Sequence, residues 1–246
     1  MYLSDTTDII IKPVRLFEKE FTFILDKEIK DIVKNINDKT LWIVTFNFQM
    51  LGKCSEDEGY LSLLSSADLF TCDGAPIAWI VTFLTRYKVP RITGIQIVEY
   101  IIKNTTKSFG IIGGRSHTAA LSNMKVDFSR VLFIFNGDIN HNSNKTISNF
   151  ADSIKATKPE YVFVALGIEK QDIVCKYLKE TGVKSIYIGV GGTFEILAGE
   201  QKRAPEWISI IGIEWFFRFI QEPRRLFKRY FIDYPRGIYF YLKNRL

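Results

Sequence analysis

Residues able to do chemistry stand directly after short apolar runs in this chain. Asp73, in Cys72-Asp73-Gly74, offers a carboxylate that could take a proton, and Arg91 offers a guanidinium that could bind an anion. Glycines that leave room for a phosphate or nucleotide beside the backbone are Gly113, Gly114, Gly189, Gly191 and Gly192. Hydroxyl and amide groups able to hold a polar ligand stand at Thr45, Asn47 and Gln171. Proton transfer and anion binding are therefore the chemistry that these residue types support.

The elements that would position these groups alternate between two periodicities. Short, β-rich apolar runs occur at residues 41–45, 68–71, 109–112, 131–135, 161–166 and 185–190. Helical spacing between the runs is clearest at residues 94–103 and 168–180. This alternation predicts an α/β fold with a Rossmann-like parallel sheet and helices on both faces. Because ligands of such folds bind at the carboxyl ends of the strands, we expect the polar residues and glycines to meet at one edge.

Each of these residues also has a purely structural interpretation. Asp73 precedes a glycine, and Asp-Gly is a common turn pair. Thr45 and Asn47 could be capping residues. Arg91 could be a solvated charge before a helix whose N-cap is Thr93. The glycine pairs could be tight turns between strand and helix, so periodicity leaves both interpretations open.

The C-terminal segment differs in composition from the rest of the chain. From Gln201 onward there are ten Lys or Arg and four Asp or Glu, which equals the net charge of +6, because the preceding 200 residues carry 23 of each sign. The same segment holds 12 of the 35 aromatic residues. Basic side chains interleaved with amphipathic rings are typical of a surface that sits on an anionic membrane. We therefore expect an α/β body at 1–199 and a helical, membrane-associating appendage at 200–246.

Other classes of protein are disfavoured by what the sequence lacks. The longest apolar stretches, such as Tyr161 to Ile168, fall short of the roughly 20 residues that span a bilayer. The N-terminal residues are acidic where a signal peptide would be basic, so we expect a cytoplasmic protein. The three Cys are odd in number and widely spaced, and His117 and His141 lack ligand spacing. Neither a disulfide framework nor a metal site is expected.

The candidate residues belong to a longer set of motifs that follow one another in a fixed order along the chain. In the body the motifs are Thr45-x-Asn47, Ala67-Asp68-x-x-x-x-Asp73-Gly74, Arg91-x-x-Gly94, Gly113-Gly114, Ala165-Leu166-Gly167-x-x-Lys170-Gln171 and Gly189-Val190-Gly191-Gly192-x-Phe194-x-x-x-Ala198-Gly199. In the tail they are Arg203-Ala204-Pro205-x-Trp207, Glu214-Trp215-x-x-Arg218 and Glu222-Pro223-x-Arg225. In this order, over residues 40–230, the chain resembles the WecG/TagA/CpsF glycosyltransferase family, glycosyltransferase family 26.

The resemblance implies an inverting hexosyltransferase of the EC 2.4.1 class that uses no metal ion or other cofactor. Such an enzyme moves a sugar from a UDP-sugar to a polyprenyl-diphosphate-linked saccharide, in the synthesis of bacterial surface polysaccharides or wall teichoic acid. It would sit peripherally on the inner face of the cell membrane. The resemblance assigns Asp73 as the base, and Thr45, Asn47 and Gln171 as residues near the sugar. It assigns binding of the leaving diphosphate to Arg91 and to the tail residues Arg203, Arg218 and Arg225.

The chain departs from the family pattern at several positions. Glu169 stands where Pro is usual, Asp172 replaces the usual Glu, and Ala75 replaces a frequent Gly. The expected His-Gly-Tyr run appears as residues 135–139, Phe-Asn-Gly-Asp-Ile. The donor sugar is therefore left open among N-acetylmannosamine, its uronic acid, glucuronic acid, glucose and galactose.

Three alternative functions are disfavoured by the sequence. A UDP-sugar-binding protein without catalysis is disfavoured by the intact Asp73. A nicotinamide-dependent oxidoreductase is disfavoured because no GxGxxG follows the first predicted strand and no acidic residue stands at the ribose position. A nucleic-acid-binding tail is disfavoured because its aromatic residues are too many and too aliphatically flanked. A homo-oligomer and a membrane-bound monomer both stay open, and Trp207, Trp215, Phe216 and Phe219 fit either core packing or membrane contact.

Overall fold

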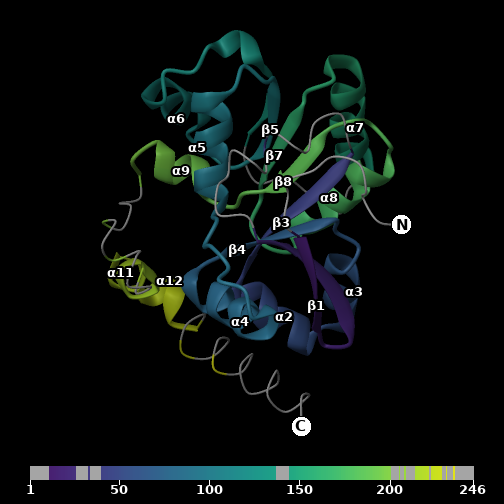
Figure 1. Cartoon of the computed structure of the whole chain (residues 1–246). Helices are drawn as coiled ribbons and strands as arrows, with labels where there is room; N and C mark the ends of the chain where they lie inside the picture. Colours follow the sequence, from purple (N-terminus) through teal and green to yellow (C-terminus); the bar gives the residue numbers. More distant parts are fainter. Residues whose placement is uncertain are drawn as a thin grey trace.

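The computed structural model describes residues 11–25, 33, 40–136, 144–200, 205, 208, 214–221, 223–228, 231 and 235. A single eight-stranded sheet runs through the body (Figure 1). Its strands are β1 (Ile11–Leu16), β2 (Lys19–Ile24), β3 (Leu41–Asn47), β4 (Leu69–Asp73), β5 (Phe109–Gly113), β6 (Val131–Phe135), β7 (Tyr161–Ala165) and β8 (Ile186–Gly189). They lie in the order β1-β2-β4-β3-β8-β7-β5-β6. Neighbouring strands are parallel except for β1 and β2, so the predicted parallel sheet is confirmed with one antiparallel edge strand.

Helices cover both faces of the sheet, as the alternating periodicity predicted. One face carries α2 (Phe48–Glu56), α3 (Glu58–Leu64), α4 (Ala75–Thr85), α7 (Asn144–Thr157) and α8 (Lys170–Glu180), whose apolar residues join one core cluster. The other face carries α5 (Gly94–Asn104), α6 (His117–Asn123) and α9 (Thr193–Leu197), which join a second cluster. The central strands β3, β7 and β8 are buried almost throughout, because they are covered from both sides.

The hairpin of β1 and β2 was not predicted from the sequence. Its turn residues, Phe17 and Glu18, have φ values of 48° and 66°, the left-handed conformation that two-residue hairpin turns require. Neither residue is the Gly or Asn that normally marks such a turn, so the sequence carries no turn signal there. The rings of Phe21 and Phe23 lie 4.9 to 5.9 Å from those of Phe46 and Phe70, which attaches the hairpin to the sheet.

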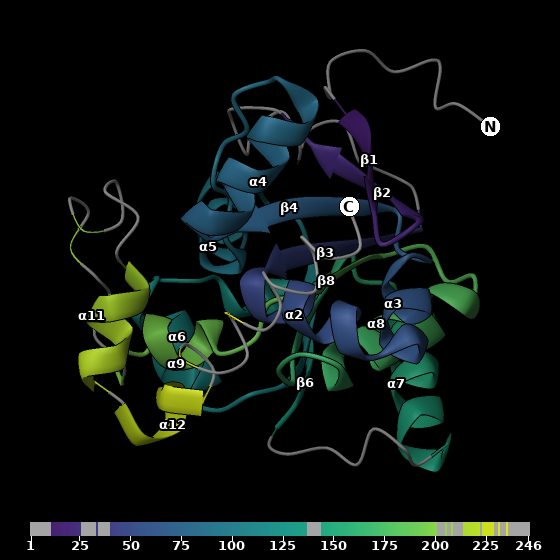
Figure 2. The same cartoon turned by 90° about the horizontal axis from the view of Figure 1, so that it is seen from below.

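Two short helices belong to the predicted appendage. They are α11 (Glu214–Gln221) and α12 (Pro223–Lys228), and they lie beside the lower part of the body, at the left of the view (Figure 1). Figure 2 looks at that end and shows α4 and the two appendage helices on different sides of α2. Among the described residues, no helix is both long and apolar enough to cross a bilayer.

Candidate functional site

The carboxyl ends of β4, β3 and β8 are neighbours in the sheet and bring the predicted polar residues together. Asn47, the last residue of β3, is paired in register with Asp73, the last residue of β4. On the other side of β3, Val44 is paired with Gly189, the last residue of β8. The expectation that these groups meet at one edge is therefore correct for Thr45, Asn47, Asp73 and the residues after Gly189.

Asp73 stands where strand β4 turns into helix α4. Its side chain is partly exposed, whereas the four residues before it in β4 are buried. The next residue, Gly74, has φ = 112°, a conformation that residues with a Cβ rarely adopt. Gly74 thus lets the chain turn sharply into α4, so the carboxylate is left at the rim of the sheet rather than within it.

Arg91 reaches the same rim although it follows helix α4 along the chain. The backbone of Arg91 forms a parallel bridge with Cys72, and the Ile92 N–H donates to the Cys72 carbonyl at 2.9 Å. This pairing uses the edge of β4 that faces away from β3. The guanidinium therefore starts from a backbone position beside Asp73. Thr93 then begins α5 with a capping box to Gln96, as predicted for the N-cap.

Thr45 and Asn47 both have structural contacts at the end of β3. The buried Thr45 hydroxyl donates to the Gly189 carbonyl at 2.8 Å and so joins β3 to β8. The Asn47 Oδ1 atom accepts from the N–H groups of Gln49 and Met50, which caps α2. The capping interpretation of Asn47 is therefore correct. Any ligand contact of Asn47 would come from its amide N–H groups.

Thr45→Val is expected to lower the free energy of unfolding by about 1–3 kcal/mol, because a near-isosteric side chain leaves the buried Gly189 carbonyl without its hydroxyl partner. Urea unfolding followed by circular dichroism measures the change. Thr45→Ser keeps the donor and serves as the control. A valine variant as stable as the serine variant would show that this hydrogen bond does not hold β3 to β8.

Two glycine-containing turns flank these strand ends. Gly113 and Gly114 have φ values of 79° and 76°, and a Cβ on Gly113 would lie 2.3 Å from Leu166 Cδ2. The second turn follows β8, where the Gly191 N–H donates to Gln171 Oε1 at 3.0 Å. Gln171 is buried, and its amide nitrogen lies 2.7 Å from where a Cβ of Gly189 would be. Gln171 therefore fixes the glycine turn, and its amide N–H groups and one lone pair of Oε1 are left for the expected ligand contact.

His117 lies beside the first glycine turn, a placement that its sequence did not indicate. Its Nε2 atom lies 2.7 Å from the Gly113 carbonyl, so Nε2 carries the donated proton. Its Nδ1 atom lies 2.8 Å from Oδ1 of Asn136, which follows β6. The ring is buried and meets Phe194 edge to face at 5.1 Å. His117 thus ties the ends of β5 and β6 to α9.

Glu195 is a second residue that sequence reasoning missed. Its Oε1 atom accepts the Arg115 N–H at 2.9 Å, between the two glycine turns. Its Oε2 atom is buried and has no hydrogen-bond partner among the described residues. A buried carboxylate oxygen normally has a donor, so this atom is suited to accept from a ligand hydroxyl or imide. The signal in the sequence would have been an acidic residue three positions after the glycine pair at 191–192.

Asp172, the departure from the family pattern noted above, is fully buried at the start of α8. Its Oδ2 atom accepts from the Tyr60 hydroxyl at 2.7 Å and from the Glu169 N–H at 2.9 Å. Burial raises the pKa of this carboxyl to about 6, against the lowering effect of the two hydrogen bonds. Because the folded state holds this proton more tightly than the unfolded state, Asp172 stabilises the fold below pH 4 and loses that contribution as the pH rises through 6.

The pH dependence of stability tests this assignment. Between pH 4.5 and 7.5, the free energy of unfolding is expected to fall by about 2 kcal/mol more in the natural chain than in Asp172→Asn. Urea unfolding at the two pH values gives the difference, and Asp152→Asn on the exposed face of α7 is the matched control. Equal pH dependence in the natural chain and Asp172→Asn would mean that Asp172 titrates near its ordinary pKa.

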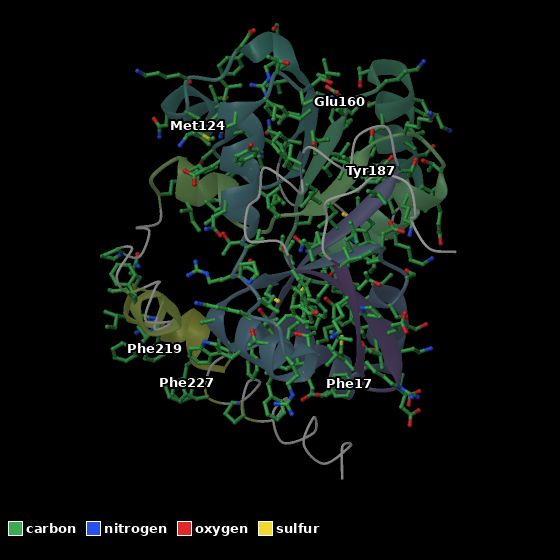
Figure 3. The ribbon with its side chains drawn as sticks, in the orientation of Figure 1. Phe17, Met124, Glu160, Tyr187, Phe219 and Phe227 are labelled. Atoms are coloured by element: carbon green, nitrogen blue, oxygen red, sulfur yellow. The ribbon has the colours of Figure 1, made fainter. Side chains whose placement is uncertain are left out.

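The predicted site also includes three arginines of the tail, Arg203, Arg218 and Arg225. Arg203 lies outside the described residues, and only the helical backbone is described for Arg218 and Arg225, in α11 and α12. Apolar side chains on these helices do face outward, because Phe216, Ile220 and Phe227 are exposed. Figure 3 labels Phe219 and Phe227 on this end of the molecule, and the Phe219 ring contacts Phe231 at 5.2 Å. Trp207 and the side chain of Trp215 also lie outside the described residues.

Metal-ligating residues do not gather in the part of the chain that the structure describes. No group of three or more His, Cys, Asp or Glu side chains has the proximity needed to hold an ion there. The three cysteines are buried free thiols, as predicted.

Together, the sheet order and the polar rim define a Rossmann-like α/β protein with polar and glycine residues gathered at the carboxyl ends of its central strands. The chain belongs to the glycosyl transferase WecG/TagA/CpsF family, whose model matches residues 21–246, and it is a glycosyltransferase of the hexosyltransferase class.

Among its curated relatives is a protein of Staphylococcus aureus strain MW2, 26% identical over 206 residues that cover 81% of this chain and 80% of the relative. Another, from Bacillus spizizenii, is 25% identical over 231 residues, covering 89% and 88%. Both are named N-acetylglucosaminyldiphosphoundecaprenol N-acetyl-beta-D-mannosaminyltransferase.

Proposed function

We propose that this chain is an inverting, metal-independent transferase that moves a sugar from a UDP-sugar onto a polyprenyl-diphosphate-linked saccharide at a membrane surface. The observation that carries the proposal is that Asp73 ends β4 at the sheet rim and that Arg91 is bridged through its backbone to Cys72, the residue before Asp73, in a chain of this family. The relatives' names specify undecaprenyl-diphosphate-linked N-acetylglucosamine and N-acetylmannosamine. UDP-N-acetylmannosamine is therefore the first donor expected to work.

Asp73 would act as the catalytic base. A sugar hydroxyl is a poor nucleophile until a positioned carboxylate takes its proton while the bond to the anomeric carbon forms. The partly exposed position of Asp73 at the sheet rim is suited to this step, since an acceptor can reach it. In a single displacement the acceptor oxygen bonds to the anomeric carbon as the bond to the UDP oxygen breaks, so the configuration inverts. The proton goes to Asp73 and the electron pair leaves with UDP.

The leaving diphosphate would be stabilised by donors from several segments. Arg91 supplies a planar, permanently charged fork that matches phosphate oxygens. The turns at Gly113-Gly114 and Gly191-Gly192 have no Cβ that would keep a phosphate from the backbone N–H groups. Arg203, Arg218 and Arg225 of the appendage would add charge when the appendage closes over the site. Cationic donors of this kind are what a departing diphosphate needs when no metal ion takes part.

The remaining polar groups would hold the sugar and the nucleoside. Asn47 would donate from its amide nitrogen, because its oxygen already accepts two backbone N–H groups. Gln171 would bind through its amide N–H groups or the remaining lone pair of Oε1. Thr45 would act indirectly, because its hydrogen bond to the Gly189 carbonyl holds the end of β8 beside β3. Glu195 would accept from a ribose hydroxyl or the uracil imide through Oε2. These assignments give each end of a UDP-sugar a complementary partner.

The proposed lipid-linked acceptor lies in a membrane, and the appendage is suited to bind a membrane surface. Exposed Phe216, Ile220 and Phe227 on α11 and α12 stand in a segment with a net charge of +6. Such a surface would bind the anionic inner face of the cell membrane, at about 1 kcal/mol for each basic residue near it.

Two other functions fit the site less well. A binding protein without catalysis would need no carboxylate at the rim, yet Asp73 stands there. A nicotinamide-dependent oxidoreductase would need a glycine-rich turn after the first predicted strand, whereas that strand, β3, ends in Asn47 and leads directly into α2.

The test of the proposed function is UDP release from a panel of UDP-sugars by the membrane-bound protein, with and without a synthetic polyprenyl-diphosphate N-acetylglucosamine. Acceptor-dependent release from one donor is expected, unchanged when a chelator is added. Release that needs a divalent cation would contradict the metal-independent mechanism. Binding of UDP with no release from any donor would favour a binding protein.

A further inference from the structure

Helix α4 presents an exposed aromatic surface that the proposed reaction does not use. Trp79 and Phe83, one turn apart on α4, are 62% and 59% exposed, and Tyr87, just after the helix, is 56% exposed. The opposite face of α4 is already buried in the core through Ile77 and Val81. Burial of the outer face is thus not needed for folding, and large aromatic side chains gathered on such a face are typical of an interaction site. Trp79, Phe83 and Tyr87 are here called the α4 patch.

Basic groups surround the α4 patch. The Arg86 guanidinium lies 4.9 Å from the centre of the Phe83 ring. The Lys12 ammonium lies 4.7 Å from the centre of the Tyr87 ring and donates to the Thr85 carbonyl at 3.0 Å, at the C-terminus of α4. Residues 75–98 contain Arg86, Lys88 and Arg91 but no Asp or Glu. The patch therefore combines aromatic rings with positive charge that no acidic residue of its own segment offsets.

The position of the α4 patch connects it to the reaction site. Helix α4 begins two residues after Asp73, so the patch and the carboxylate belong to one strand–helix unit. The helix also lies at the same end of the molecule as α11 and α12 (Figure 1), and Figure 2 shows that α4 and the appendage helices flank that end on different sides. A flat surface that touches α4 could thus touch the appendage helices as well.

We propose that the α4 patch is a second docking surface for an anionic bilayer, separate from the appendage. Trp and Tyr favour the headgroup region of a membrane, and Lys and Arg add attraction to anionic lipids. Two contacts on different sides of one end would fix how the body is oriented, so that Asp73 faces the bilayer that carries the acceptor. A second copy of the chain is a poorer occupant, because a symmetric contact would bring the same cations of both copies together. The orientation argument rests on the proposed function; the docking itself does not.

Vesicle binding by the full chain, without any sugar substrate, tests the docking. We expect Trp79→Ala/Phe83→Ala to weaken partitioning onto phosphatidylcholine vesicles containing phosphatidylglycerol by about tenfold or more. Phe128→Ala/Tyr177→Ala is the matched control, because both side chains are exposed near the amino ends of strands, at the start of β6 and before β8. Its partitioning should stay within twofold of the natural chain. Arg86→Gln/Lys88→Gln should weaken binding to these vesicles by about fivefold per charge and leave binding to neutral vesicles unchanged.

Three outcomes would overturn the proposal. The first is equal partitioning of Trp79→Ala/Phe83→Ala and the control variant. The second is that Trp79→Ala/Phe83→Ala binds vesicles like the natural chain but no longer self-associates in sedimentation velocity. That result would assign the patch to contact with a second copy of the chain. The third is an equal loss of affinity by Arg86→Gln/Lys88→Gln on anionic and on neutral vesicles. Since no sugar donor is present, a failed transferase assay and failed docking are independent results.

Discussion

Asp73→Asn is expected to lower kcat for sugar transfer by about 10²- to 10⁴-fold, the range that a positioned general base contributes. The amide keeps the size of the side chain but cannot take a proton from the acceptor hydroxyl. Asp73 ends β4 at the sheet rim, and the sharp turn at Gly74 comes from the backbone, so the variant should fold normally. UDP release and lipid-linked product, measured at saturating donor and acceptor, give kcat directly.

The control for Asp73→Asn separates catalysis from binding. The Kd for UDP should change by less than threefold, because the base faces the acceptor and not the leaving group. Asp152→Asn, on the exposed face of α7, makes the same chemical change far from the rim and should leave kcat unaltered. Transfer by Asp73→Asn within fivefold of the natural rate would remove Asp73 from its assigned role.

Arg91→Ala is expected to lower kcat/KM by about 10²- to 10³-fold, since loss of one donor to a developing charge has an effect of that size. The backbone bridge between Cys72 and Arg91 does not depend on the side chain, so the rim itself should persist. Arg91→Lys keeps the charge without the planar fork and should recover only part of the loss. The measurement is kcat/KM for the donor, together with the inhibition constant of UDP.

The matched control for Arg91→Ala is Arg15→Ala, which removes an exposed guanidinium from edge strand β1. It should leave kcat/KM within twofold. If Arg91→Ala bound UDP and turned over like the natural chain, the charge on the leaving diphosphate would have to be met entirely by other groups, such as the appendage arginines.

The core of the fold could be predicted because its strands are buried on both faces. Six continuous apolar runs matched β3 to β8, and the residues after them meet because carboxyl ends of parallel strands share an edge. The hairpin of β1 and β2 could not be predicted, since Phe17 and Glu18 adopt a turn conformation that their residue types do not signal. Pro13 and the charged residues of this edge pair also interrupt the apolar runs that marked the other strands.

The site was predictable only in part, because several contacts depend on packing between distant segments. Arg91 reaches the rim through a bridge to Cys72, which no local pattern indicates. Gln171 was expected near the sugar, yet it also supports the turn after β8 through Gly191. His117 and Glu195 carry no motif of their own, and they join the site only where α6 and α9 meet the glycine turns. Spacing along the chain could not reveal these pairings.

The most direct test of the central claim is to incubate the membrane-bound protein with UDP-N-acetylmannosamine and synthetic undecaprenyl-diphosphate N-acetylglucosamine, and to analyse the lipid product by mass spectrometry and anomeric proton NMR. The account predicts a lipid-linked disaccharide with a new bond of inverted configuration, formed by the natural chain and not by Asp73→Asn. A product of retained configuration, or equal product from Asp73→Asn, would contradict it.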